Sequence, residues 1–515
     1  MLINLTHTYI ITNITGDSMS AQIGIIVAFS IYLIAMLAVG IYFSNKSADL
    51  SDYALGGRSI GKWVTSLSTQ ASDMSGWLLM GLPGLAYASG FGEAFWLAAG
   101  LSLGTYLNWK FIARRLRIYT KIAGDSLTIS DFFENRFNDK TRMLRIIASV
   151  FTVIFFTLYV SSGFIAGGKL FNTVFGIPYE YAILIGGGVL VLYTFLGGFF
   201  AVSWTDFIQG FIMLSAAIIV PIVGIVSMGG ISATMERVTA ISPTLFSITK
   251  NIMGNDLTAI AVISSAAWGL GYFGMPHILV RFMGIDSPDN IRDARIIAMA
   301  WVIISLASAV FIGIIGHAYT GGSLLAGGDS EKIFMLMVQS LFFSFMAGVM
   351  LSAILAAIMS TADSQLLVAA STISEDIFKT IFKTEATQKQ LVWTGRAAVI
   401  AISIVAYTIS LNPNSSVFKV VSFAWAGLGA TFGPIIISAL YWRRATAKGA
   451  FAGILFGGST VLLWKNLSHL GGIFTIYEIV PGFIMSVLAI VIVSLIDKEP
   501  SKEITDVFDR YQEEL

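Results

Sequence analysis

The sequence predicts an all-α integral membrane protein with about thirteen transmembrane helices, and its composition and hydropathy are the observations that predict it. Of its 515 residues, 56% are hydrophobic and only 12% are charged, and the mean hydropathy is +0.80. Soluble domains carry roughly 25% charged residues, which argues against a soluble fold. The apolar residues also form runs of about 20, the length that a helix needs to cross a bilayer.

In chain order, the candidate spans are Ile23–Ser44, Trp63–Ser89, Glu93–Ile112, Met143–Thr173, Tyr179–Phe199, Trp204–Met228, Leu257–Leu279, Ile296–Thr320, Phe345–Ile377, Leu391–Leu411, Phe418–Tyr441, Gly449–Trp464 and Ile476–Ile496. The second is interrupted by a polar centre, and the twelfth is short. The N-terminus lacks the basic-then-apolar order of a signal peptide, so the first span is expected to stay in the membrane.

Basic residues orient the chain, because cytoplasmic loops are enriched in Lys and Arg. With the N-terminus outside and the C-terminus in the cytoplasm, every internal segment except the short one after the fifth span is basic. Arg281, Arg292 and Arg295 then fall in the internal segment after the seventh span. Lys169 lies near a span end, where we expect its ammonium group to reach water along the membrane surface. At the inner end of the ninth span, we expect Asp376 to meet solvent.

The net charge of +1 gives no reason to expect nucleic acid or an acidic partner. The absence of cysteine excludes disulfides and thiolate metal sites, and the four histidines lack the spacing of a metal motif. We see no plausible nucleophile–base set, so we do not expect an enzyme.

The stretch from Ala71 to Gly84 places an acid, two serines, three glycines and a proline inside a long apolar run. A charge at the bilayer centre is costly, so Asp73 is expected to face a partner or a wet cavity. Gly76, Gly81 and Pro83 weaken the helix, and broken backbone at membrane depth is tolerated only where it lines a cavity or is buried in protein. We therefore predict a discontinuous helix that binds an ion and a small solute.

The seventh span repeats this peculiarity between Trp268 and Pro276, with three glycines before the proline. Two interrupted segments at matching positions of two halves point to the binding site of an inverted-repeat transporter. Residues 63–228 and 257–441 would then be the repeats, with peripheral helices at 23–44 and 449–496. The prediction is one transmembrane domain over residues 1–498. A cytoplasmic tail follows at 499–515, as a solvated helix or a frayed end.

Hydroxyl groups in the ninth span could complete a cation site. An unwound helix frees backbone carbonyls, and hard cations such as Na⁺ prefer oxygen ligands. Ser360 and Thr361 are adjacent hydroxyls in an apolar helix, followed by Asp363 and Gln365. Hydroxyls also bond back to their own helix in membrane spans, and the residues alone leave both interpretations open.

Several motifs resemble those of the sodium/solute symporter family, and closely those of its sodium/proline symporters. They are Gly56–Ser59, Ala71–Trp77 with Gly81–Gly84, Leu196–Phe199 with Val202–Asp206, Trp268–Arg281, Leu351–Ala357 with Ser360 and Thr361, and Ala424–Gly427 with Phe432–Pro434. The similarity runs from roughly residue 25 to 498, and the motif in the second span is its most specific part.

The resemblance implies a five-plus-five inverted-repeat (LeuT-like) core with broken helices that works by alternating access. The sodium ligands that it implies are the carbonyls of Ala71, Met74 and Ala357 and the hydroxyls of Ser360 and Thr361. The implied pocket for L-proline is formed by Ser75, Gly76, Trp77, Tyr159, Trp268, Tyr272 and Pro276. Coupling or the ion pathway is assigned to Asp73, Arg58 and Asp206. Asp363 is an additional acid, which suggests a second cation or a proton relay.

Plainer interpretations stay open for several of these residues. Trp268 and Tyr272 could pack as i, i+4 neighbours. Asp206 could be an acid at the start of span six that the helix dipole favours, and Arg58 could only mark orientation. Gln70 and Met275 depart from the pattern of proline carriers and leave the solute open.

The predicted function is the import of proline together with sodium across the plasma membrane. Sodium is the coupling ion, no cofactor is expected, and the lipid bilayer is the surrounding medium. No obligate protein partner is evident. The alternative is a sodium-coupled symporter of another amino acid or small organic solute. A membrane sensor or a channel is the alternative from a different class, although the tail is too short for a signalling domain.

Overall fold

The computed structural model describes residues 18–44, 55–194, 199–322, 328–382 and 385–515, and this part of the chain is helical with two isolated β-bridges. Nine of the described helices are long and apolar enough to cross a membrane, or ten if one bent pair counts as a single span. The all-helical membrane fold is therefore confirmed. The count of about thirteen stays a prediction.

The long helices are α2 (Ser18–Ser44), α9 (Met143–Phe175), α11 (Phe199–Ser227), α15 (Ile291–Tyr319), α17 (Ser344–Ser371), α18 (Gln388–Ile409), α19 (Val417–Tyr441), α20 (Ala447–Leu467) and α21 (Ile479–Ile496). Shorter helices are α4 (Lys62–Asp73), α5 (Leu82–Ser89), α6 (Phe91–Leu107), α7 (Arg114–Ile122), α8 (Ile129–Phe137), α10 (Tyr179–Thr194), α12 (Ile231–Ile241), α13 (Ala259–Ala266), α14 (Pro276–Gly284), α16 (Ile333–Leu341) and α22 (Lys502–Glu513). Helices of other types include η1 (Gly56–Arg58), η2 (Trp77–Gly81), η3 (Asn108–Ala113), η4 (Ala267–Gly274), η6 (Ser330–Lys332) and η7 (Thr372–Phe382).

Three of the predicted spans are made of shorter pieces. The second consists of α4, η2 and α5, the third of α6 with η3, and the seventh of α13, η4 and α14. The fifth corresponds to the short helix α10. The sixth begins earlier than predicted, at Phe199, so Asp206 lies inside α11 rather than at its start. The motif residues Leu196 to Gly198 lie outside the described residues.

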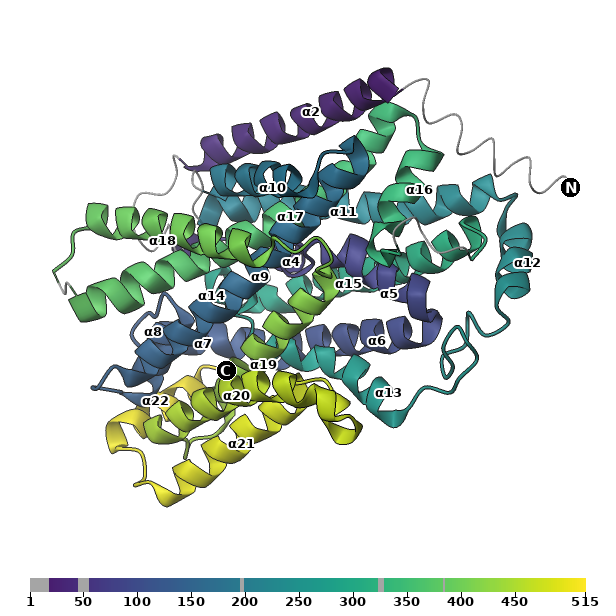
Figure 1. Cartoon of the computed structure of the whole chain (residues 1–515). Coiled ribbons are helices and arrows are strands. Elements are labelled where there is room, and N and C mark those ends of the chain that lie inside the picture. The colour runs from purple at the N-terminus through teal and green to yellow at the C-terminus, as the bar shows by residue number, and fades with distance from the viewer. Residues whose placement is uncertain (1–17, 45–54, 195–198, 323–327, 383–384) are drawn as a thin grey trace, which may run out of the picture.

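Helices α4, α9, α15 and α17 lie in the middle of the molecule (Figure 1). Helix α2 lies at one edge, packed against α17 and α11, while α20 and α21 pack against α19 at the opposite edge. Glycines allow the closest approaches, as is common between membrane helices. A Cβ added to Gly100 would overlap the carbonyl oxygen of Ala266, and one added to Gly104 would overlap that of Gly269. This contact holds η4 directly against α6.

Two predictions about charged groups near span ends were wrong. Lys169 does not extend to the membrane surface: it is buried, and its Nζ lies 2.6 Å from Glu331 Oε2 and 2.9 Å from Asp329 Oδ2. Asp376 does not meet solvent, since its side chain is 1% exposed. In both cases an oppositely charged group from a distant part of the chain lies close to the buried charge, as burial of a charge requires.

The tail was predicted to be a solvated helix or a frayed end. It forms a helix, but the prediction that it is solvated was wrong. Helix α22 packs onto the structure, with Tyr511 fully buried and its ring stacked on that of Tyr119 at 4.2 Å between centroids. The Tyr511 hydroxyl accepts a hydrogen bond from Arg115 at 3.0 Å and donates one to the carbonyl oxygen of Leu440. Phe508 is buried beside it. The amphipathic helix thus covers the ends of α7 and α19.

Candidate functional site

The first interruption lies at Met74–Gly76. Helix α4 ends at Asp73, and Met74 has φ −85° and ψ 72°, outside the helical region. The amide of Ser75 donates to the carbonyl oxygen of Asp73, and the chain becomes helical again at η2. The predicted break is confirmed.

The second interruption lies between η4 and α14. Met275 is extended, with φ −86° and ψ 104°, and Pro276 takes the first position of α14. The two helical pieces are bent by 47°. Proline suits this place because the first turn of a helix does not need its missing N–H.

Three of the predicted sodium ligands meet at the first break. The Oγ of Ser360 lies 2.8 Å from the carbonyl oxygen of Ala71 and 3.3 Å from that of Ala357. The hydroxyl of Thr361 is buried without a hydrogen-bond partner. Met74, the remaining carbonyl contributor in the prediction, directly follows the last residue of α4. The arrangement places several oxygen atoms close together, as the binding of a hard cation requires. The roles of these residues as ligands stay predictions.

Asp73 joins the two breaks. Its Oδ2 accepts a hydrogen bond of 2.6 Å from the hydroxyl of Tyr272 in η4, while Oδ1 is buried without a partner. The hydroxyl of Tyr159 lies 3.5 Å from the carbonyl oxygen of Asp73. A buried carboxylate oxygen without a partner is costly, so it marks a place where a polar or charged ligand would be stabilised.

Aromatic rings surround Trp268. Its ring lies 5.8 Å from that of Trp77, 5.1 Å from Phe418 and 5.6 Å from Tyr477, measured between centroids. The indole nitrogen of Trp425 donates to the carbonyl oxygen of Trp268 at 2.8 Å. This bond uses a carbonyl of the 3₁₀-helix η4. The aromatic wall thus includes predicted solute contacts from both breaks.

A buried polar cluster lies beside these elements. Asp206 Oδ2 accepts hydrogen bonds from Arg281 at 2.7 Å and from Ser68 at 2.8 Å. The same arginine nitrogen donates to Ser364, which follows Asp363 in α17. Asp206 Oδ1 and Asp363 Oδ2 are buried without partners. The structure thus brings Asp206 and Asp363 close to one guanidinium group.

The predicted residue Arg58 lies outside this arrangement. Arg58 has its side chain among α7, the α7–α8 connection and α14, where it donates to Asp125, Thr120 and the carbonyl oxygens of Met283 and Ser126. Burial lowers the pKa of its guanidinium, and the nearby Arg117 lowers it further. Pro276, at the second break, also lines a narrow cavity together with Thr128 and Ser371.

A wider cavity of about 390 Å³ lies on the other face, beside Lys169, Glu331 and Phe418. The Phe418 ring, which lines this cavity, also stacks on the ring of Trp268. Among the described residues, no group of His, Cys, Asp and Glu could hold a transition metal.

Residues 53–457 match the model of the sodium:solute symporter family. The osmoregulated proline transporter OpuE of Bacillus subtilis is 46% identical over 483 residues, which is 93% of this chain and 96% of the relative. The sodium/proline symporter of Escherichia coli is 45% identical over 487 residues, which is 94% of this chain and 95% of the relative. The chain belongs to the sodium:solute symporter family. It is a multi-pass membrane transporter, not an enzyme.

Solved structures show the fold of this symporter. A Na⁺-coupled sialic acid symporter in a substrate-bound outward-open state has a TM-score of 0.75 at 23% identity, covering 93% of this chain and 99% of that one. A transporter of the nucleobase-cation-symport-1 family has a TM-score of 0.54 at 12% identity, covering 90% of this chain and 99% of that one. The chain thus has the helical fold of these transporters.

The residue of this symporter that sequence reasoning missed is Arg281. It was assigned to an internal loop, but it is 3% exposed and its guanidinium donates to Asp206, Ser68, Ser364 and the carbonyl oxygen of His277. A lone basic residue in an apolar stretch just after a break could have indicated a buried ion pair.

Proposed function

We propose that this symporter carries proline together with Na⁺. The observation that carries the proposal is the meeting of the Ser360 hydroxyl with the Ala71 carbonyl at the broken end of α4, 2.8 Å apart. The hydroxyl of Thr361 and one oxygen of Asp73 are buried nearby without partners. Relatives that span nearly the whole chain are named as proline transporters and sodium/proline symporters, which supports proline as the solute.

In the proposed site, Na⁺ is held by the carbonyls of Ala71, Met74 and Ala357 and by the hydroxyls of Ser360 and Thr361. Dehydrating Na⁺ requires several oxygen ligands, and a helix end supplies carbonyls that no helical N–H uses. Asp73 contributes negative charge from the same break. Its carboxylate favours a bound cation through this charge and is not one of the proposed ligands.

Proline is a zwitterion with a small apolar ring, so its site needs apolar walls and few polar groups. We assign the walls to Trp77, Tyr159, Trp268, Tyr272 and Pro276. The freed amides at Ser75 and Gly76 suit the carboxylate. The adjacency of Trp77 and Trp268 and the bond between Tyr272 and Asp73 support this assignment.

The proposed architecture has about thirteen spans, with five-plus-five inverted repeats at 63–228 and 257–441. Such repeats work by alternating access, in which one repeat moves against the other around the bound cargo. We place the N-terminus outside and the face that carries α22 in the cytoplasm, because the positive-inside pattern favours this orientation. Asp206 and Asp363 would lie on the ion pathway, with Arg281 compensating one of their charges.

The test is uptake of labelled proline by proteoliposomes with and without an inward Na⁺ gradient. Accumulation above the external concentration is expected only with the gradient. Equal uptake without Na⁺ would refute the coupling. Competition by other amino acids tests the identity of the solute. This test matters because Gln70 is buried and its Oε1 lacks a partner, so a more polar solute could bind to it.

A further inference from the structure

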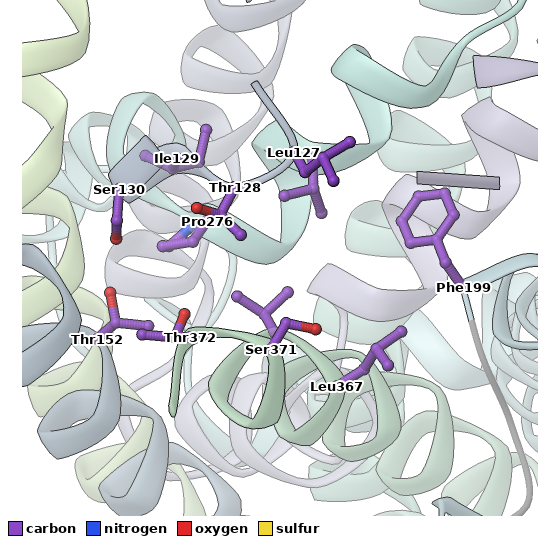
Figure 2. Close-up of a pocket in the computed structure, with 12 residues that line it drawn as sticks. Leu127, Thr128, Ile129, Ser130, Thr152, Phe199, Pro276, Leu367, Ser371 and Thr372 are labelled. Carbon is purple, nitrogen blue, oxygen red and sulfur yellow. The ribbon is translucent and has the colours of Figure 1, made fainter. Parts of the chain in front are cut away.

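A narrow cavity lies between the α7–α8 connection and the end of α17, close to the face that carries α22. Its volume is only about 20 Å³, which is room for about one water molecule. Figure 2 shows Thr128 and Ile129 on one side of it and Ser371 with Thr372 on the other. Pro276 also lines the cavity, which therefore reaches the second break. In the proposed alternating access, release of cargo past Pro276 toward this face would require the cavity to widen.

Thr128 closes the cavity on the α8 side and has three contacts at once. Its side chain lines the cavity, and its Oγ1 caps α8 by accepting from the amide of Asp131 at 3.0 Å. The same hydroxyl donates to the carboxylate of Asp376, with both oxygens at 3.2 Å. Since Asp376 lies in η7, this bond connects α8 to the continuation of α17.

One guanidinium group serves three carboxylates at this junction. Arg145 Nε lies 2.6 Å from Glu134 Oε2 and 3.8 Å from Asp376 Oδ1. A terminal nitrogen of Arg145 pairs with Asp131. Because α8 supplies Asp131 and Glu134, the arginine is held mainly by α8 and reaches Asp376 only weakly. The Thr128 hydroxyl thus joins α8 to η7, and the long ion pair joins η7 to Arg145 in α9. Arg142, at the start of α9, also donates to the carbonyl oxygen of Thr380 in η7 at 3.3 Å. The Thr128–Asp376 bond and the long ion pair can be broken without dismantling α8.

The segment that carries Asp376 is itself unusual. Helix η7 is a π-helix over Thr372–Phe382, and π-helical turns are rare and frequently found at functional sites. It continues directly from α17, which carries Ser360 and Thr361. A displacement of α17 at the sodium site would thus be transmitted to Asp376 along one helix.

We propose that Thr128, Arg145 and Asp376 form an inner latch that holds the narrow cavity closed and opens when cargo is released toward the α22 face. These are positioning residues, which touch neither the proposed cation site nor the aromatic wall. The inference rests on the proposed alternating access, but it does not depend on which solute is carried.

The chain contains no cysteine, so a single introduced thiol reports access to the cavity without background. We would place it at Ser371 by S371C and label inside-out vesicles with a membrane-impermeant thiol reagent, without Na⁺ or solute. Thr128→Val removes the hydroxyl, and Asp376→Ala removes its acceptor. Each is expected to raise the labelling rate about fivefold, the effect of losing one hydrogen bond that holds the closed state.

Matched controls separate the latch from general damage. Thr387→Val removes a threonine that caps α18 in the same way but lies away from the cavity, and Glu375→Ala removes the neighbouring carboxylate, which pairs with Lys379. Both, together with Thr128→Ser, should label at the rate of the parent. Unchanged labelling in both latch variants, or an equal rise in the controls, would overturn the latch. A faster labelling rate combined with Na⁺-independent uptake would instead overturn the proposed function and leave the latch intact.

Discussion

The two interrupted segments differ in chemistry although both break a helix at the centre of the fold. The first contributes the carbonyl of Ala71, which accepts a hydrogen bond from the Ser360 hydroxyl of α17, and the buried carboxylate of Asp73. The second contributes Trp268 and Tyr272, and its backbone is held by the indole of Trp425. One break concentrates oxygen atoms and the other concentrates aromatic surface.

This difference suggests a division of work between the breaks. The oxygen-rich first break suits a cation, and the aromatic second break suits the ring of a small solute. Their connection is the hydrogen bond between Tyr272 and Asp73, through which occupancy at one break can influence the other. Substitutions at one break should therefore change sodium dependence and solute affinity in different proportions.

Asp73→Asn should have the largest effect. It removes the negative charge at the cation side while keeping the shape of the side chain, so Na⁺-driven proline uptake should be almost lost at ordinary Na⁺ concentrations. Uptake by proteoliposomes over a range of Na⁺ concentrations measures this. An unchanged Na⁺ dependence in the variant would remove Asp73 from the coupling mechanism.

Trp268→Ala tests the aromatic side. It removes the ring that contacts Trp77, Phe418 and Tyr477, so proline binding should weaken more than tenfold at saturating Na⁺, while half-saturation by Na⁺ changes less. Equilibrium binding of labelled proline over a range of Na⁺ concentrations measures both the proline affinity and the Na⁺ concentration for half-saturation. Trp109→Ala is the matched control, since Trp109 is equally buried but packs on Phe282, away from the breaks. Equal losses of affinity in the two variants would contradict the assignment.

Ser360→Ala tests whether the first break binds the cation. The loss of one oxygen ligand should weaken apparent Na⁺ affinity about tenfold, with proline affinity nearly restored at saturating Na⁺. Ser352→Ala is the control on the same helix, because its hydroxyl donates only to the carbonyl oxygen of Gly348 one turn earlier. If both variants bind Na⁺ as the parent does, Ser360 is not a ligand.

Glycine substitutions compare the packing of the breaks. A Cβ at Gly271 would overlap the indole of Trp425, whereas one at Gly76 would meet Ala166 at 3.0 Å and Ile358 at 3.4 Å. Overpacking costs about 1–3 kcal/mol, so Gly271→Ala should lower the thermal unfolding midpoint in detergent more than Gly76→Ala. The reverse order would show that the first break is the more tightly packed.

The breaks could be predicted from the sequence because glycine and proline weaken a helix and a buried acid needs a partner, so that together they indicate interrupted backbone beside a polar site. The pairing of buried charges could not be predicted. Arg281 and Lys169 lie near the ends of apolar runs, where hydropathy cannot distinguish a solvated charge from a buried one. Their acidic partners, Asp206 and Glu331, are far away in the sequence and come close only in the fold.

The docking of α22 was missed for a different reason. A short charged tail has the composition of a solvated segment, but Phe508 and Tyr511 are three residues apart and therefore share one face of the helix. This apolar face was a usable signal. Its partner, the ring of Tyr119, could be identified only from the structure.

The most direct test of the account is the affinity of the purified protein for proline as a function of Na⁺ concentration. If the cation at the first break and the solute at the second are coupled, proline should bind at least about tenfold more tightly in saturating Na⁺ than without it, and bound proline should raise the affinity for Na⁺ by the same factor. Asp73→Asn should abolish this coupling, so that neither ligand changes the affinity for the other. Equal proline affinity with and without Na⁺ in the unmodified protein would contradict the account.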